Sequence, residues 1–310
     1  MSRVRNLLAW LFLSAVWGTA FMAIKAGLDA FANTPVLFAA VRYDLASILM
    51  IGYVVVTVNQ WRPETRSEWG LVLVGGAFMI AGYHAFLFVG ELSTTSAVAA
   101  VVVSLSPILT TGFARLMLPG KALSRMGLVG LGLGLFGVII ISQPNLTALA
   151  ESDLGGELLV LMAAVSFALG SVLATTIDAE LPIETMEAWS MILGAVMLHA
   201  ISLGVGEGVG AVDWTLEGVL ALAYLSVVAS ALGFLIYFDL LEKLGPVEIN
   251  LVSYAAPLWA ALTGWLVLGE SVSVATGVGF LVIFAGFWLI KREAIAQELA
   301  GLPALLGPDD

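Results

Sequence analysis

An arginine and an aspartate stand two residues apart inside an apolar run, VRYDLASILM, at residues 41–50. Ionisable side chains in such a run face a wet cavity or a partner. Two positions on a helix are about 200° apart, so Arg42 and Asp44 do not share a face. Arg42 therefore either binds the carboxylate of a ligand through its planar fork or forms a structural pair. Asp44 either pairs with another helix or stays protonated, which makes it a proton-coupling candidate.

Two further polar side chains, Tyr83 and His84, lie at a similar depth in another apolar run. A histidine side chain ordinarily titrates near neutral pH, so His84 is a second proton-coupling candidate, and the alternative is a hydrogen-bonded core histidine. Trp17 and Phe167 lie near the middle of apolar runs, away from the interface where tryptophan usually gathers. We expect Tyr83 and His84 to anchor a ligand and the two aromatic rings to line its cavity or to pack in the core.

Two prolines, Pro107 and Pro257, interrupt apolar runs at positions 150 residues apart. Each removes a backbone hydrogen bond, which predicts a hinge or a tolerated kink. Ser104 and Tyr254 stand three residues before these prolines, on the same helix face. Both are candidates for the ligand site, and Tyr254 alternatively donates to a neighbouring carbonyl.

These residues must be positioned by membrane-spanning helices. The chain has 310 residues, of which 60% are hydrophobic and 11% charged, with a mean hydropathy of +1.04. Apolar runs of about 20 residues recur throughout, which indicates an all-α integral membrane protein rather than a barrel. We expect ten transmembrane helices, near residues 7–28, 34–58, 67–91, 94–117, 125–142, 155–178, 184–206, 214–238, 246–268 and 272–290. Residues 291–310 would form a cytoplasmic tail.

The charged residues predict the orientation. With ten spans, the lysines and arginines outside the spans or at their ends all fall on the side of the N-terminus, whereas Lys25 lies within a turn of the outer end of the first span. The positive-inside rule therefore places both termini in the cytoplasm. The chain has no cysteine, two histidines and a net charge of −11. These counts argue against thiolate chemistry, a metal site, a cofactor or nucleic acid as a partner. The sequence leaves a monomer and a homodimer open.

The sequence repeats weakly at a spacing of 150 residues. Pro107 aligns with Pro257, Gly127 with Gly277, and Trp17 with Phe167. The halves, 7–142 and 155–290, would each hold five spans. An odd number makes the second half enter the membrane from the opposite side, and inverted repeats are typical of secondary transporters.

Several stretches resemble the EamA-like branch of the drug/metabolite transporter superfamily. The resemblance rests on SAVWGTAFMAIKAGL (14–28), AAVRYDLASILM (39–50), STTSAVAAVVVSLSPILTTGFARLML (93–118) and LVSYAAPLWAALTGWLVLGESVSVATGVGFLVIFAGFWLI (251–290). It implies two EamA units around a central cavity and export or exchange of small metabolites, often amino acids. The first half has Leu118-Pro119-Gly120 where the family usually has Gly-Glu, so Glu270 alone carries that glutamate.

One glycine motif has a packing interpretation. GLGLFG at 132–137 matches a nucleotide-binding pattern, but it lies inside an apolar span without a preceding strand. Gly127, Gly130, Gly134 and Gly137 instead share one helix face, which favours close approach of two helices.

The expected function is a secondary active transporter, working by alternating access across the plasma membrane. The substrate would be a small, carboxylate-bearing metabolite, with a proton or another ion as a coupling partner and the lipid bilayer around it. A membrane-embedded enzyme lacks a recognisable catalytic motif here. A channel usually surrounds a symmetry axis, which suits an inverted repeat less well.

Overall fold

The computed structural model describes residues 2–118, 125–142, 155–244, 249 and 252–305, and within these ranges it is all-helical. Seven helices are long and apolar enough to cross a membrane, and three shorter apolar helices cover 126–141, 252–268 and 274–289. The prediction of an all-α architecture is confirmed. Seven predicted spans overlap the long helices and three overlap the shorter ones, so the count of ten spans stays a prediction.

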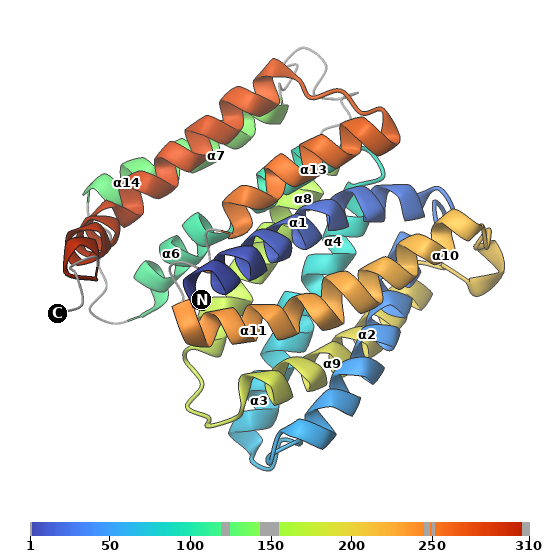
Figure 1. Cartoon of the computed structure of the whole chain (residues 1–310). Coiled ribbons are helices and arrows are strands. Elements are labelled where there is room, and N and C mark those ends of the chain that lie inside the picture. The colour runs from blue at the N-terminus through green and yellow to red at the C-terminus, as the bar shows by residue number, and fades with distance from the viewer. Residues whose placement is uncertain (1, 119–124, 143–154, 245–248, 250–251, 306–310) are drawn as a thin grey trace.

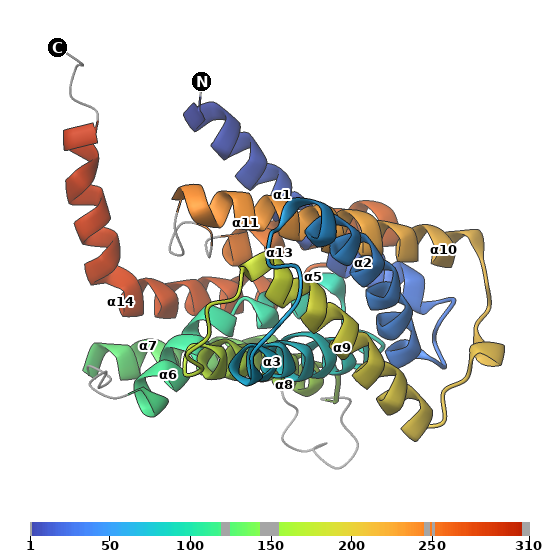
Figure 2. The same cartoon turned by 90° about the horizontal axis from the view of Figure 1, so that it is seen from below.

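The helices of the first half are α1 (Ser2–Leu28), α2 (Pro35–Thr57), α3 (Arg66–Val74), η1 (Gly75–Gly82), α4 (Tyr83–Gly90), α5 (Ser96–Val103), α6 (Ser106–Met117) and α7 (Arg125–Ser142). Those of the second half are α8 (Gly155–Ala174), α9 (Ile183–Gly204), η2 (Val209–Ala211), α10 (Leu216–Ala223), η3 (Tyr224–Leu232), α11 (Gly233–Leu244), α13 (Val252–Leu268) and α14 (Val274–Leu305). Helix α14 continues into the predicted tail, and Figure 2 shows its last part turned away from the other helices. Positions 119–120 and 306–310 lie outside the described residues.

Threonine caps start several helices, because their hydroxyls satisfy backbone N–H groups that lack helical partners. Thr65 accepts from the Glu68 amide while the Glu68 carboxylate accepts from the Thr65 amide, which is a capping box. The Thr95 hydroxyl caps α5 by accepting from the Val98 amide, and the Thr215 hydroxyl caps α10 by accepting from the Gly218 amide. These local signals account for the starts of three helices.

Two apolar helices contain π-helical segments at corresponding places. Segment η1 joins α3 to α4, and η3 joins α10 to α11. Their first residues, Gly75 and Tyr224, are 149 positions apart. The span with Pro107 instead breaks at Ser104–Leu105 between α5 and α6, whereas Pro257 lies inside continuous α13. Each π segment and each break alters which side chains face the interior.

The helices pack as two groups, which Figures 1 and 2 show on either side of the interior. Helix α1 packs against α13 and the α10–η3–α11 helix, and we call these the α1 bundle. Helix α8 packs against the α3–η1–α4 helix and against α5 and α6, and we call these the α8 bundle. Helix α2 packs on α9 at one edge of the molecule, and α7 packs on α14 at the opposite edge.

The α7–α14 contact confirms the predicted small-residue face. A Cβ atom at Gly137 would lie 2.8 Å from the Gly279 carbonyl oxygen, and one at Gly286 would lie 2.6 Å from the Gly130 carbonyl oxygen. Backbones this close leave no room for side chains. The glycines therefore permit close helix packing, as the sequence predicted.

The two ends of the molecule differ in charge. Hydrogen bonds gather the loops after α1, α4, α9 and α13 at one end, which we call the acidic end because Glu91, Glu207, Asp213 and Glu270 lie there. For example, the Glu207 carboxylate accepts from the amides of Val36 and Leu37 at the start of α2, at 3.1 and 2.7 Å. The opposite end, the basic end, holds Arg62, Arg66, Arg115, Lys243 and Arg292.

Candidate functional site

Arg42 lies in the interior, where α2 meets η3. Its side chain is buried, with 6% of the residue exposed, and its Nε donates to Ser230 Oγ at 3.1 Å. The guanidinium carbon lies 5.3 Å from the Tyr43 ring centroid and 5.9 Å from that of Phe88. Aromatic faces attract a cation, so these rings stabilise a charge that burial disfavours. The Arg42 side chain therefore points into the interior.

A hydrogen-bond chain runs beside Arg42. The Tyr43 hydroxyl and His84 Nε2 are 2.8 Å apart, and His84 Nδ1 lies 2.9 Å from the Ile80 carbonyl oxygen. Because a carbonyl only accepts, Nδ1 carries the hydrogen, and a neutral ring then accepts from Tyr43 at Nε2. His84 is thus a buried histidine with both nitrogens partnered, which is the arrangement expected of a core histidine. Protonating Nε2 would require Tyr43 to turn from donor to acceptor.

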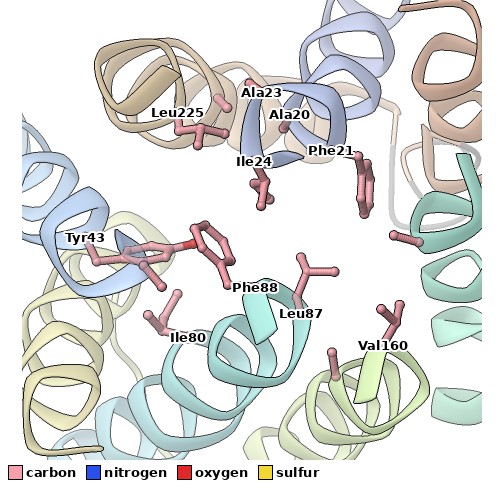
Figure 3. Packing of buried hydrophobic residues seen from close by; sticks show 14 of the residues in the cluster. Ala20, Phe21, Ala23, Ile24, Tyr43, Ile80, Leu87, Phe88, Val160 and Leu225 are labelled. Atoms are coloured by element: carbon pink, nitrogen blue, oxygen red, sulfur yellow. The ribbon is translucent and has the colours of Figure 1, made fainter. Parts of the chain in front are cut away.

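Aromatic rings extend this cluster from α2 to α8. The Tyr83 ring lies 4.6 Å from the His84 ring and 5.6 Å from the Phe167 ring, in edge-to-face contacts. Figure 3 shows Tyr43 and Phe88 side by side, between α2 and α4. Through Tyr43, the structure therefore connects four sequence-predicted residues in one row of contacts: Arg42, His84, Tyr83 and Phe167.

Trp17 belongs to a neighbouring aromatic group. Its indole N–H donates to the Ala229 carbonyl oxygen in η3 at 3.1 Å. Its ring lies 5.6 Å from that of Phe234 and 5.4 Å from that of Tyr237. A Cβ at Gly233 would meet the indole nitrogen at 2.8 Å, so glycine makes room for the tryptophan. Trp17 holds α1 against the η3–α11 helix.

The remaining polar candidates lie apart from Arg42. The Tyr254 ring packs on Phe284 and Phe287 of α14, and its buried hydroxyl has no hydrogen-bond partner among the described residues. Ser104 is buried at the α5–α6 break and donates to the Val101 carbonyl oxygen at 2.6 Å. Neither contact reaches the cluster around Arg42.

Asp44 has found a partner on another helix. Its carboxylate lies 2.8 Å from His199 Nε2 of α9, and both side chains are partly exposed. Asp44 and Arg42 thus diverge, as their angular separation on the helix predicts. This pair connects α2 of the first half to α9 of the second.

Sequence reasoning missed Tyr43 and Ser230, which contact His84 and Arg42. Tyr43 follows Arg42 directly, and an arginine buried beside aromatic residues commonly uses them. Ser230 falls 150 residues after Ile80, whose carbonyl accepts from His84. The repeat could therefore have pointed to Ser230. Among the described residues, no group of three or more metal-ligating side chains is present.

The family model described as EamA-like transporter family matches residues 6–143 and again residues 154–292. The chain belongs to the EamA-like transporter family. It is 25% identical over 287 residues to an uncharacterised transporter, YoaV, of Bacillus subtilis, covering 92% of this chain and 96% of YoaV. It is 29% identical over 279 residues to the uncharacterised inner membrane transporter YedA of Escherichia coli K12, covering 88% and 86%.

A solved crystal structure shares the fold of this EamA-like chain, with a TM-score of 0.64 and 22% identity. The match covers 95% of this chain and 99% of the other. The apolar helices and these relatives establish a multi-pass membrane protein of a transporter family. The resemblance drawn from the sequence is confirmed.

Proposed function

We propose that this EamA-like protein is a secondary active transporter that exports or exchanges small, carboxylate-bearing metabolites by alternating access. The observation that carries the proposal is the position of Arg42. Its Nε binds Ser230, which leaves the paired η nitrogens for a carboxylate, since no described residue is hydrogen-bonded to them. A buried fork of this kind binds a carboxylate through two parallel bonds.

The site joins the two halves of the chain. Arg42, Tyr83 and His84 come from the first match to the family model, and Ser230 and Phe167 come from the second. A ligand held between them contacts both halves, which is where transporters with internal repeats bind their substrates. We place Trp17 in the wall of the same pathway, and Ser104 and Tyr254 line it only after α13 or the α5–α6 break moves.

The packing supports ten spans in two inverted five-helix repeats. In the predicted repeat, α1 corresponds to α8, the α5–α6 pair to α13, and the α3–η1–α4 helix to the α10–η3–α11 helix. When each helix is replaced by its counterpart, the members of the α1 bundle become those of the α8 bundle. The α2–α9 and α7–α14 pairs are unchanged by this exchange. The π segments η1 and η3 correspond under the same exchange. Pro107 and Pro257 would then serve as hinges at equivalent places, and Asp44 and His84 remain proton-coupling candidates.

We infer that the basic end faces the cytoplasm of the cell, with both termini there, because lysine and arginine gather at that end. The acidic end then faces outward across the plasma membrane. In this orientation the hydrogen bonds at the acidic end close the outer side.

Proteoliposomes test the proposal. We expect purified protein to move amino acids or other small carboxylates down an imposed proton or substrate gradient. Arg42→Lys should reduce the flux at least tenfold, because a lysine cannot form the two parallel bonds. Arg62→Lys, an exposed change at the basic end, should leave it unaltered. Normal flux in folded Arg42→Lys would remove Arg42 from the site, and no flux for any metabolite under any gradient would overturn the transporter assignment.

A further inference from the structure

Two contacts join the α1 bundle to the α8 bundle at the acidic end. Lys25 Nζ of α1 donates to the carbonyl oxygens of Glu91 and Leu92, at 2.6 and 3.2 Å, just after α4. The Glu270 carboxylate, after α13, accepts from the Ser96 amide at 3.1 Å and from its hydroxyl at 3.3 Å, at the start of α5. Both contacts place a charge at the helix terminus of opposite partial charge. Together they close this end.

Glu91 is buried at this end of the molecule. It lies in the turn that follows α4, is completely buried, and neither carboxylate oxygen has a hydrogen-bond partner among the described residues. Glu68, which is also buried, instead accepts three hydrogen bonds. An ionised carboxylate without partners costs several kcal/mol when buried. Glu91 therefore differs from a structural acid, because nothing in the described structure compensates its charge directly.

The surroundings of Glu91 have opposing effects on the pKa of its carboxyl group. Burial raises the pKa of the Glu91 carboxyl well above its usual range, the nearby Lys25 ammonium lowers that pKa, the Glu270 carboxylate raises it, and the more distant Arg42 lowers it. On the α8 side, Glu157 is engaged by the Thr94 hydroxyl at 3.5 Å. Burial is the largest of these effects, so the closed end stabilises the protonated acid.

We propose that Glu91 is a proton-binding site of this transporter, occupied while the acidic end is closed and emptied when that end opens. Opening admits water to the carboxylate and separates the Lys25 and Glu270 contacts, so the anion becomes hydrated. The closed state then binds one more proton than the open state. This site rests on the proposed transport function, and it supplies a proton for coupling at a place distinct from Asp44 and His84.

The sign of the pH effect follows from proton binding. The raised pKa belongs to the closed state, so closure is favoured at low pH and lost as pH rises through that pKa. One linked proton changes the ratio of open to closed molecules by up to about tenfold per pH unit. Below the pKa of the open-state carboxyl, both states are protonated and the ratio of open to closed molecules no longer depends on pH.

The natural absence of cysteine makes opening measurable by thiol labelling. Ala97, which follows Ser96 in α5, is 1% exposed and lines a small cavity together with Pro257 of α13. Purified Ala97→Cys in detergent would be labelled with a charged methanethiosulfonate reagent from pH 5 to pH 9. Labelling of exposed Ala211→Cys corrects for the ionisation of the thiol itself. We expect the corrected rate at residue 97 to rise with pH.

Two matched variants in the Ala97→Cys protein decide whether Glu91 is responsible. Glu91→Gln imitates the protonated acid, so the corrected rate should stay low and independent of pH. Glu270→Gln weakens the contact to Ser96, so the rate should rise at every pH while its pH dependence remains. A flat rate in the parent, or an unchanged pH dependence in Glu91→Gln, would overturn the proposal. Labelling needs no substrate, so this result is separate from the outcome of the flux experiment.

Discussion

Tyr43 links the residues of the candidate site, because it touches both Arg42 and His84. Tyr43→Phe removes the hydroxyl and leaves the buried His84 Nε2 without a donor. We expect a loss of about 1 kcal/mol in stability, typical of a buried hydrogen bond in a membrane protein. Thermal unfolding of the purified protein measures it, with exposed Tyr53→Phe on the same helix as the control. Equal shifts in both variants would show that the Tyr43–His84 bond contributes nothing.

The sequence predicted which charged residues need a partner, but not which residues those partners are. The cost of burying an ionised group predicted that Arg42 and Asp44 would each need a partner or a cavity. It did not identify Ser230 or His199, because those residues are 188 and 155 positions away in the sequence. The sequence did not single out Glu91, because its burial depends on how the two bundles meet.

At the scale of helices, the α7–α14 contact provides a sharp test. Gly137→Ala places a methyl group against the Gly279 carbonyl, so α14 must move away. We expect a clear fall in the unfolding temperature and, in flux measurements, a loss of activity. Gly132→Ala, on the same helix, meets nothing within 4 Å and should be neutral or slightly stabilising, because alanine favours helix. Equal behaviour of the two variants would contradict close packing through the Gly137 face.

The helices themselves followed from apolar length, but their irregular segments did not. Runs of about 20 apolar residues locate the spans. The π segments depend on packing around Gly75–Gly82 and Tyr224–Leu232 rather than on a residue with its own signal. The prolines did not predict helix breaks consistently, because the helix is interrupted just before Pro107 but is continuous through Pro257.

At the scale of the whole molecule, the predicted arrangement and orientation of the two halves rested on the repeat and on the charge asymmetry. An odd number of spans per half requires the halves to be inverted, and the helix contacts agree with such an exchange. The closure of one end could not be foreseen, because the 150-residue repeat places no counterpart of Glu270 in the first half. A contact equivalent to Glu270–Ser96 at the basic end would lack this carboxylate, so under the proposed alternating access we expect the two sides to respond differently to pH.

The orientation gives the last prediction, again through single cysteines. Ser67 lies in the first turn of α3 at the basic end and Ala211 lies in η2 at the acidic end, and both are exposed. If lysine and arginine keep the basic end in the cytoplasm, a membrane-impermeant thiol reagent added to intact cells should label Ala211→Cys. Ser67→Cys should react only after the membrane is permeabilised. The reverse labelling pattern would show that the acidic end faces the cytoplasm. Glu91 would then exchange its proton with the cytoplasm instead of the outside.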